Sequence, residues 1–190
     1  MDLLAALDAH HPRTPAEAAD LARVRALAAT GDPWSRTTRL HVTGSAVVLH
    51  PPTQRVLLRW HPRLGGWYQV GGHVDPGEHD PLAAACREAR EETGLPDLVP
   101  WPDPAHPAIL HVAVVPVPAG RGEPAHEHAD VRWVLATGRP GDAVPESPDA
   151  PLRWMTLAEA LAITGEDNLH ETLTRLAALL ADGGPSGRER

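Results

Sequence analysis

The sequence contains no lysine and no phenylalanine, and only one cysteine among its 190 residues. The single cysteine, Cys86, excludes a disulfide within the chain and fits a reducing compartment. No apolar run is long enough to cross a bilayer. The first residues, MDLLAALDAHH, lack the basic start and the apolar core of a secretory signal. These absences predict a cytoplasmic protein that does not have a membrane as a partner.

Positive charge is also scarce. Seventeen basic residues, all of them arginine, stand against 25 acidic ones, and the formal net charge is -8 at pH 7. Long nucleic acids are held by clustered basic side chains, so a duplex or a long RNA is not expected as a partner. A small phosphorylated ligand fits this balance, because a divalent metal can bridge acidic side chains to phosphate.

The chain divides into three segments. Residues 1–36 favour a helical extension, in which Thr14, Pro15 and Glu17 have the pattern of an N-cap, a first-turn proline and a capping-box glutamate. Residues 37–182 are predicted to form the main domain, and residues 183–190 a disordered tail. The helices of the extension could mediate a homodimer.

Strands and helices alternate along the main domain, which is typical of an α/β or α+β sandwich. A Pro-Pro turn region between the first two strands predicts a hairpin. Asp80 and Gly94 have the residue types of an N-cap and a helix end. The predicted strands cover residues 40–50, 55–60, 67–72, 109–117, 130–137 and 151–155, and the predicted helices cover 81–93, a segment starting at 156, and 168–181.

Three glutamates crowd one face of the predicted helix over residues 81–93. Glu88, Glu91 and Glu92 follow an i, i+3, i+4 pattern, so their carboxylates are neighbours. Each close like-charge pair costs a few tenths of a kcal/mol, roughly, on an isolated helix. One interpretation is a solvated face that Arg87 and Arg90 neutralise. The other is a set of carboxylates that cations hold together.

These residues resemble the Nudix box of the Nudix hydrolase superfamily, G-x5-E-x7-R-E-U-x-E-E-x-G-U, in which U is apolar. The sequence departs from the pattern by one extra residue between Glu78 and Arg87, which we expect within EHDP, before the helix. The resemblance covers about residues 38–165. The matching positions are Gly72, Glu78, Arg87, Glu88, Ala89, Glu91, Glu92, Gly94 and Leu95.

The resemblance implies a Nudix-type α/β/α sandwich with a mixed sheet, to which the N-terminal helices are added. It also implies a specific activity, the hydrolysis of a nucleoside diphosphate linked to another moiety. The expected substrate is a small nucleotide derivative such as a nucleotide sugar, a dinucleotide or a (d)NTP. The expected cofactor is Mg²⁺ or Mn²⁺, because divalent cations neutralise a pyrophosphate and lower the pKa of bound water.

Roles for individual residues follow from the same resemblance. The expected metal ligands are Glu88, Glu91 and Glu92, with the carbonyl of Gly71 as a further oxygen. One glutamate, in the box or in a later loop, would act as general base, and Glu127 is the later candidate for either role. Arg87 would orient the helix glutamates through hydrogen bonds. Gly72, Glu78 and Gly94 would be structural positions of the box, and His73 and Asp75 would shape its loop.

The run HEHAD, residues 126–130, is a second cluster of polar groups. If the chain is extended there, His126, His128 and Asp130 share one face. The alternative is a polar loop that leads into a strand. A zinc site built from His126 and His128 is the weaker hypothesis, because the sequence shows no further ligand cluster beside them.

Four residues before the box are candidates for substrate binding. Arg59 and Arg63 could meet phosphate, and Trp67 and Tyr68 could stack on a base or a sugar. The alternatives are surface residues at a hairpin tip for the arginines and core positions for the aromatic residues. Trp101 has the same two interpretations.

Two other functions compete with hydrolysis. A non-hydrolytic module could use the same fold to bind a nucleotide and regulate a partner, although such a module has no need of three clustered carboxylates. An isomerase acting on an isoprenoid diphosphate would need a reactive cysteine in the cleft. Cys86 falls on the apolar stripe of the helix instead, where packing is the expected role.

Overall fold

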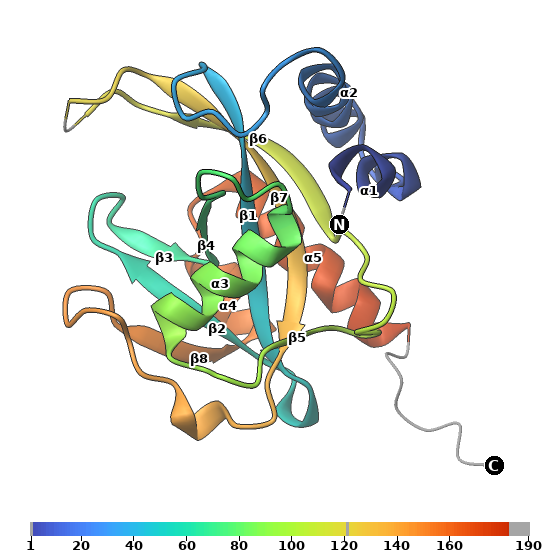
Figure 1. The fold of residues 1–190 in the computed structure, drawn as a ribbon. Coiled ribbons are helices and arrows are strands. Elements are labelled where there is room, and N and C mark those ends of the chain that lie inside the picture. Colours follow the sequence, from blue (N-terminus) through green and yellow to red (C-terminus); the bar gives the residue numbers. More distant parts are fainter. Residues whose placement is uncertain (1, 121, 183–190) are drawn as a thin grey trace.

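The computed structural model describes residues 2–120 and 122–182, drawn in Figure 1. The tail predicted at residues 183–190 lies outside the described residues. Within them, no helix has the length and apolarity that a bilayer crossing requires. The helices are α1 (Leu3–Ala9), α2 (Pro15–Thr30), α3 (Pro81–Thr93), α4 (Leu157–Ile163) and α5 (Asp167–Ala181). The strands are β1 (Leu40–His50), β2 (Arg55–His61), β3 (Gly66–Tyr68), β4 (Val70–His73), β5 (Val99–Pro100), β6 (His111–Val117), β7 (His126–Ala136) and β8 (Leu152–Thr156).

All eight strands belong to one mixed sheet with β1 near its middle. β1 pairs antiparallel with β2 and with β4, and parallel with β7. β6 lies antiparallel to β7, and β8 lies antiparallel to β2. The predicted hairpin of β1 and β2 is confirmed, with Val48 opposite Leu57. The parallel pairing of β1 with β7 is what makes the sheet mixed.

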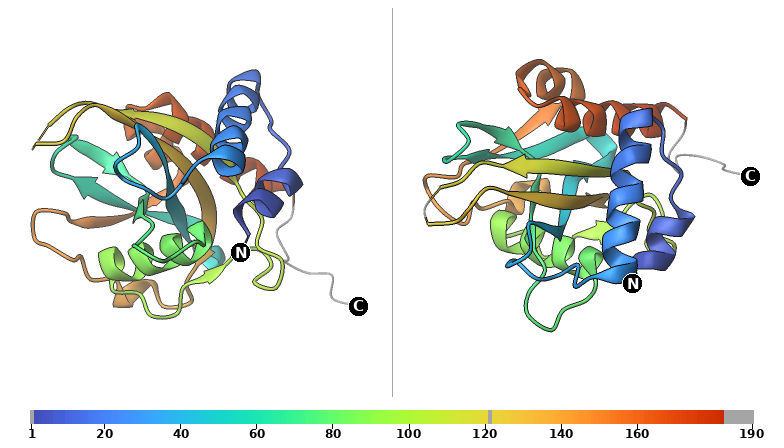
Figure 2. Two further views of the ribbon diagram at one scale, coloured as in Figure 1. Left: turned by 45° about the horizontal axis from the view of Figure 1, so that its top comes forward. Right: turned by 90° about the horizontal axis from the view of Figure 1, so that it is seen from above.

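Helices cover both faces of the sheet, as Figure 2 shows with α5 and α3 on opposite sides. Successive residues of β1 point to opposite faces. Val47 therefore packs in a buried cluster with Leu173 of α5, whereas Val48 packs in a separate cluster with Ala89 of α3. The predicted α/β/α sandwich with a mixed sheet is confirmed.

Helix α3 sits very close to the middle of the sheet. At Gly44 of β1, an added Cβ would collide with the carbonyl oxygen of Pro81, at the start of α3. Small residues on the inner face of the helix, Ala85 and Ala89, are fully buried and allow this approach. The consequence for function is that the carboxylates of α3 lie next to the backbone of the sheet.

Helix α2 lies along the outer edge of β6 (Figures 1 and 2). The backbone N–H of Val112 donates to the carboxylate of Glu17 across 3.1 Å, and that of Val114 donates to Asp20 across 2.9 Å. An uncovered edge strand is a template for aggregation, and α2 removes that hazard. The N-terminal helices are therefore packed against the sheet and share a buried cluster with it.

The predicted capping box at the start of α2 is only half right. The hydroxyl of Thr14 accepts from the backbone N–H of Glu17, as expected for an N-cap. The carboxylate of Glu17 does not return to Thr14. It is buried, lies 2.6 Å from the guanidinium of Arg175 on α5, and lies 2.7 Å from the ring of His10. The buried guanidinium of Arg175 thus pairs with the carboxylate that the sequence pattern assigns to the N-terminus of α2.

The observed strands differ from the prediction in three main places. The strand predicted at residues 67–72 is split at Gln69, because β3 pairs with β2 while β4 pairs with β1. The strand predicted from residue 130 begins at His126, where its backbone already pairs with β6. The two-residue strand β5 was not predicted, since so short a segment carries no periodic signal.

Candidate active site

Helix α3 begins and ends where the sequence predicts. The carboxylate of Asp80 accepts from the backbone N–H groups of Leu82 and Ala83, at 2.9 and 3.1 Å. At the other end Gly94 adopts a left-handed φ of 68°, which favours glycine. Both ends fix the rotation of the helix and therefore the directions of its glutamates.

Two of the three glutamates turn toward the glycine pair at the middle of β4. A Cβ on Gly72 would lie 2.5 Å from the carboxyl carbon of Glu88, so the carboxylate occupies the space that a side chain would fill. The backbone N–H of Gly71 donates to a carboxylate oxygen of Glu92 across 3.0 Å. Glu91 points outward, with a side chain that is 56% exposed compared with 12% for Glu92.

The environment of Glu92 favours its protonated form. Burial raises the pKa of this carboxyl to about 7, and the nearby carboxylates of Glu88 and Glu146 act in the same direction. Arg59 opposes the shift from 3.2 Å, as does the N–H of Gly71. Burial also raises the pKa of Glu88, against the lowering effect of Arg87. A cation between these groups would reverse both shifts.

Arg87 is the hub of the loop that precedes α3. Its guanidinium donates to the carbonyl oxygen of His73 across 2.9 Å. It also contacts four carboxylates: Glu88 at 2.9 Å, Glu91 at 3.2 Å, Glu78 at 3.4 Å and Asp75 at 3.4 Å. The extra residue between Glu78 and Arg87 therefore does not separate the two side chains. Residues 74–80 form the loop that accommodates it.

The donor set around the glycine pair fits a hard divalent cation. Glu88 and Glu92 supply carboxylate oxygens beside Gly72 and Gly71, and oxygen donors are those that Mg²⁺ and Mn²⁺ prefer. The carboxylates of Glu88, Glu91 and Glu92 do not converge on one point among the described residues, because Glu91 turns toward Arg87. Glu88 and Glu92 are the pair that the fold brings together.

A cleft of about 490 Å³ lies beside strand β4. Gly71 and Gly72 form part of its wall, so the cleft and the glutamates meet at the glycine pair. Arg63 and Tyr68 also line it, whereas Trp67 does not. Two of the four predicted substrate contacts are thus placed in the cleft.

Asp130 lies in the wall of the cleft and is nearly fully buried. Its carboxylate accepts from the hydroxyls of Thr43 and Ser45, at 3.0 and 2.6 Å, and pairs with Arg132 at 2.7 Å. Arg132 in turn donates to the side-chain oxygen of Asn168 on α5 across 2.6 Å. This network fixes the cleft wall to the helix behind it.

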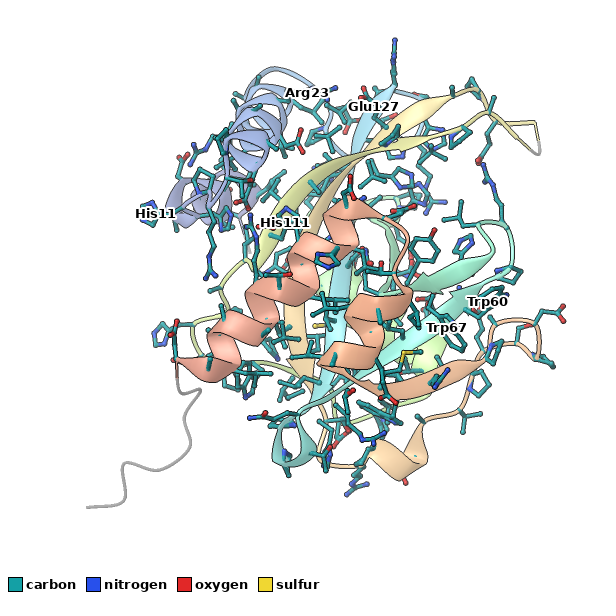
Figure 3. All side chains as sticks on the ribbon, turned by 180° about the vertical axis from the view of Figure 1, so that it is seen from behind. His11, Arg23, Trp60, Trp67, His111 and Glu127 are labelled. Atoms are coloured by element: carbon teal, nitrogen blue, oxygen red, sulfur yellow. The ribbon has the colours of Figure 1, made fainter. Side chains whose placement is uncertain are left out.

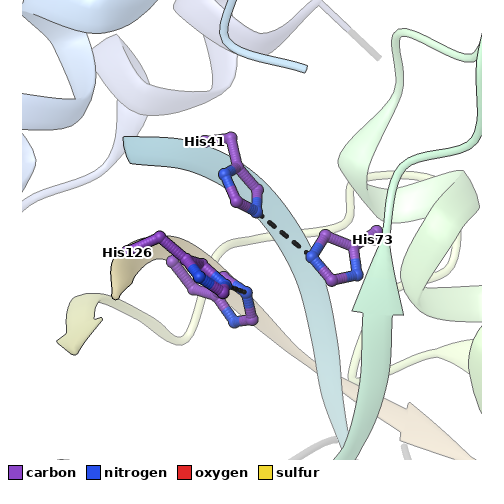
Figure 4. Close-up of side chains that lie close together, drawn as sticks. His41, His73 and His126 are labelled. Atoms are coloured by element: carbon purple, nitrogen blue, oxygen red, sulfur yellow. Dashed lines mark hydrogen bonds between the residues drawn. The ribbon is translucent and has the colours of Figure 1, made fainter. Parts of the chain in front are cut away.

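Four histidines gather beside the same cleft, His41, His73, His126 and His128, and all but His41 line it (Figure 4). Residues 126–130 are in a strand, so the prediction that His126, His128 and Asp130 would share a face if extended holds, and all three line the cleft. Burial lowers the pKa of His73 to about 3 and that of His128 to about 4, and it lowers the pKa of His41. The rings of His41, His73 and His128 are therefore neutral near pH 7.

Sequence reasoning missed His41 and His73 as members of this group. His41 precedes His126 by 85 positions, and no local motif joins the two. Only the pairing of β1 with β7 and with β4 brings them together. Alternation along the predicted first strand could have placed His41, Thr43 and Ser45 on one face, but not opposite β7.

Glu127 points away from the histidines. Its carboxylate lies 2.8 Å from the guanidinium of Arg23 on α2 and 3.9 Å from that of Arg39, and it is not part of the cleft wall. Figure 3 shows Arg23 and Glu127 together at the α2 end of the sheet. As a neighbour of His126 and His128 in an extended strand, Glu127 necessarily faces the other side.

The predicted aromatic contacts are mostly core residues. Trp67 packs edge-on against Trp60, with ring centroids 5.6 Å apart, and contacts the buried cluster under α5 (Figure 3). Trp101 packs against the same cluster. Cys86 packs against the cluster under α3, and burial raises the pKa of its thiol, so it is not a reactive cysteine.

Glu146 is a part of the site that the sequence did not reveal, and Arg59 joins it to the helix glutamates. Arg59 lies between two carboxylates, 3.2 Å from Glu92 and 3.4 Å from Glu146. Glu146 belongs to the loop before β8, and no motif marks it. The guanidinium of Arg59, a predicted phosphate contact, thus lies beside the carboxylate of Glu92 and offsets part of its negative charge.

A model of the NUDIX domain matches residues 40–176. Among solved structures, the C. elegans Ap4A hydrolase binary complex is similar, with a TM-score of 0.58 and 22% identity over 75% of this chain and 98% of that chain. The E. coli dihydroneopterin triphosphate pyrophosphohydrolase gives a TM-score of 0.53 and 18% identity over 70% of this chain and 92% of that chain. The NUDIX domain of Shewanella oneidensis NrtR, complexed with ADP ribose, gives a TM-score of 0.55 and 19% identity over 82% of this chain and 97% of that chain. At these identities the likeness establishes the fold. No curated protein matches the sequence significantly.

Proposed function

The chain belongs to the NUDIX domain family, and on that premise we propose that it is a hydrolase that cleaves the pyrophosphate linkage of a small nucleoside diphosphate derivative, with Mg²⁺ or Mn²⁺ as cofactor. One observation carries the proposal. Glu88 and Glu92 lie against Gly71 and Gly72, and the same glycines form the wall of the cleft. A diphosphate in the cleft therefore meets a site for cations at this wall.

The residues around the glycine pair have different proposed roles. Glu88 and Glu92, with Glu91 beside them and with the carbonyl of Gly71, would hold the cation, which would supply positive charge for the diphosphate and for the attacking water. Arg87 positions Glu88 and Glu91 through its hydrogen bonds. Glu92 is suited to accept a proton from the attacking water, because its carboxylate lies at the glycine pair in the cleft wall, where the substrate is expected.

Substrate recognition falls to the cleft. Arg63 is placed for a phosphate or ribose oxygen, and the ring of Tyr68 offers a surface for a base or a sugar. The names of two similar structures, an Ap4A hydrolase and a dihydroneopterin triphosphate pyrophosphohydrolase, support a substrate with a phosphate chain linked to a nucleoside or a pterin group. We propose a nucleotide sugar, a dinucleotide or a (d)NTP.

A second candidate is a non-hydrolytic nucleotide-binding module. The observation in its favour is the similarity to the NUDIX domain of NrtR, which was crystallised with ADP ribose. The buried pair Glu88 and Glu92 favours hydrolysis, because a binding module has no use for carboxylates whose ionisation is costly without a cation. Binding of ADP ribose without turnover would favour the module.

A substrate panel with matched variants tests the proposal. Nucleotide sugars, dinucleotides, dNTPs and oxidised dNTPs are incubated with Mg²⁺, and the products are separated by chromatography. At least one substrate should be hydrolysed, and kcat should fall by a factor of about 100 or more in Glu92→Gln, the range for loss of a general base. Glu171→Gln, the same change on α5, is the control and should keep full activity. An inactive panel, or a fully active Glu92→Gln, would sink the assignment.

A further inference from the structure

The four clustered histidines come from three neighbouring strands. His41 on β1 is the register partner of His128 on β7, and His126 lies two residues earlier on the same face of β7. His73 closes β4, where its partner on β1 is Thr43. The sheet itself therefore brings together four side chains that the sequence scatters over 88 positions, from 41 to 128.

The ring nitrogens of these residues converge. One nitrogen from each ring lies within 4.8 Å of those from the other three. The Nε2 atoms of His41 and His73 are 3.1 Å apart, and those of His126 and His128 are 3.2 Å apart. A tetrahedral ion with Zn–N bonds of about 2.0–2.1 Å needs nitrogens roughly 3.3 Å apart. Both pairs already have that spacing, and the pairs face each other (Figure 4).

Two of the rings are oriented by backbone carbonyls. Nδ1 of His41 lies 3.1 Å from the carbonyl oxygen of Thr38, and Nδ1 of His126 lies 2.9 Å from that of Pro124. A carbonyl only accepts, so both Nδ1 atoms carry the proton and both Nε2 lone pairs point toward the cluster. The second nitrogen of a metal-binding histidine donates in the same way in known sites.

We propose that His41, His73, His126 and His128 bind one late first-row transition-metal ion, with Zn²⁺ as the expected occupant, at a site separate from the glutamates of α3. The donor chemistry separates the two sites: four imidazoles select Zn²⁺, Ni²⁺ or Cu²⁺, whereas the oxygen donors at Gly71 select Mg²⁺ or Mn²⁺. A four-ligand tetrahedral site is closed to water, which is the pattern of a structural ion.

The ion would brace the loop that carries the box. His73 follows the glycine pair directly, and its carbonyl oxygen accepts from Arg87 across 2.9 Å. Fixing the His73 ring to β1 and β7 would fix this carbonyl and, through Arg87, the orientation of Glu88 and Glu91. The histidine site would then act as a positioning element for the predicted magnesium site.

Metal binding by the purified full chain tests the proposal. Isothermal titration with Zn²⁺ in the presence of excess Mg²⁺ should give one site per chain, because Mg²⁺ occupies the oxygen donors. Titration with Co²⁺ should give the strong visible absorption of a tetrahedral complex. The affinity for Zn²⁺ should fall at least about tenfold in His126→Gln and in His73→Gln, as for the loss of one ligand. His170→Gln, an exposed histidine on α5, should bind like the wild type.

The two metal sites are distinguished by a converse variant. Glu88→Gln with Glu92→Gln should lose pyrophosphate hydrolysis and keep Zn²⁺ binding with the Co²⁺ spectrum unchanged. The proposal is overturned if the wild type binds no Zn²⁺ under excess Mg²⁺, if Co²⁺ shows only the weak bands of an octahedral complex, or if the histidine variants bind as tightly as the wild type. Because the Co²⁺ spectrum of the wild type decides by itself, a poorly folded variant leaves the test intact.

Discussion

The carboxylate of Glu92 accepts a hydrogen bond from the backbone N–H of Gly71, across 3.0 Å between helix α3 and strand β4. A backbone donor does not change rotamer, so this bond fixes one oxygen of Glu92 relative to the cleft wall. The other oxygen faces Arg59 at 3.2 Å. Glu92 is thus held by a backbone N–H and by an arginine side chain, and its own side chain is mostly buried.

The metal-free protein should lose stability as pH rises through the titration of Glu92. The ordinary pKa of a glutamate is 4.5, and burial raises that of Glu92 to about 7, so between these values the folded state binds the extra proton and rising pH disfavours folding. Relative to Glu92→Gln, the wild type should lose on the order of 3 kcal/mol between pH 4.5 and pH 8. Urea unfolding in a chelator at several pH values measures the difference.

Three charged groups face Glu92 and set the size of this effect: Arg59 on β2, Glu88 on α3 and Glu146 in the loop before β8. At pH 4.5 the wild type and Glu92→Gln should be similarly stable, because the protonated carboxyl of the one and the amide of the other are both uncharged. Parallel stability curves across the pH range would show that the carboxyl is not perturbed by burial.

A methyl group at Gly72 should displace Glu88 and weaken the predicted magnesium site. The Cβ of Gly72→Ala would lie 2.5 Å from the carboxyl carbon of Glu88, closer than van der Waals contact allows. Magnesium affinity should fall about 10–100-fold, the usual cost of disturbing a ligand's orientation. The dependence of hydrolysis on Mg²⁺ concentration measures it. Gly141→Ala, where an added Cβ meets nothing within 4 Å, is the control.

The parts of the site that the sequence could predict are local. Asp80, Gly94 and the spacing of the three glutamates define α3 from residues that are neighbours in the chain, and the structure confirms the bounds of that helix. The direction of each glutamate was not predictable. It depends on how closely α3 approaches β1 at Gly44, which is a property of the packed sheet.

Strand bounds decided two other points. The sequence predicts a strand from residue 130, and the resemblance treats Glu127 as part of a loop before it. The strand begins at His126, and alternation then sends Glu127 toward Arg23. His41 and His73 join the cluster only through strand register, which hydrophobic patterns in one sequence do not specify across the 85 positions between His41 and His126.

Removal of the Arg63 guanidinium should affect substrate binding and leave the chemical step unchanged. Arg63 lines the cleft, and its guanidinium donates to the carbonyl oxygen of Pro118 across 3.1 Å, which leaves further N–H groups of the guanidinium to bind a substrate. Arg63→Ala should raise KM about tenfold, as for one charge-assisted hydrogen bond, with kcat unaltered. Arg139→Ala, an exposed arginine outside the cleft, should change neither constant. A fall in kcat at constant KM would contradict a binding role.

The N-terminal helices should prove to be part of the folded core and not a separate appendage. Burial tends to raise the pKa of Glu17, but hydrogen bonds from His10, Arg175 and the backbone hold it at about 2. Glu17→Gln removes one of the two carboxylates that pair with the buried Arg175, and breaking such a buried pair costs about 3–5 kcal/mol. Unfolding followed by tryptophan fluorescence reports this on the whole domain, because Trp133 of β7 lies in the cluster shared with α1 and α2.

The sign of the pH dependence gives this last prediction a second readout. The pKa of Glu17 in the folded protein is below the ordinary value of 4.5, so its stabilisation is present above pH 4.5 and is lost as pH falls toward 2. The difference between wild type and Glu17→Gln should shrink over that interval. Asp8→Asn breaks an exposed pair with Arg25 at the surface of the same helices and should cost less than about 1 kcal/mol. If both variants were equally mild, the helices would be docked loosely, and the edge of β6 would be protected by something other than Glu17 and Asp20.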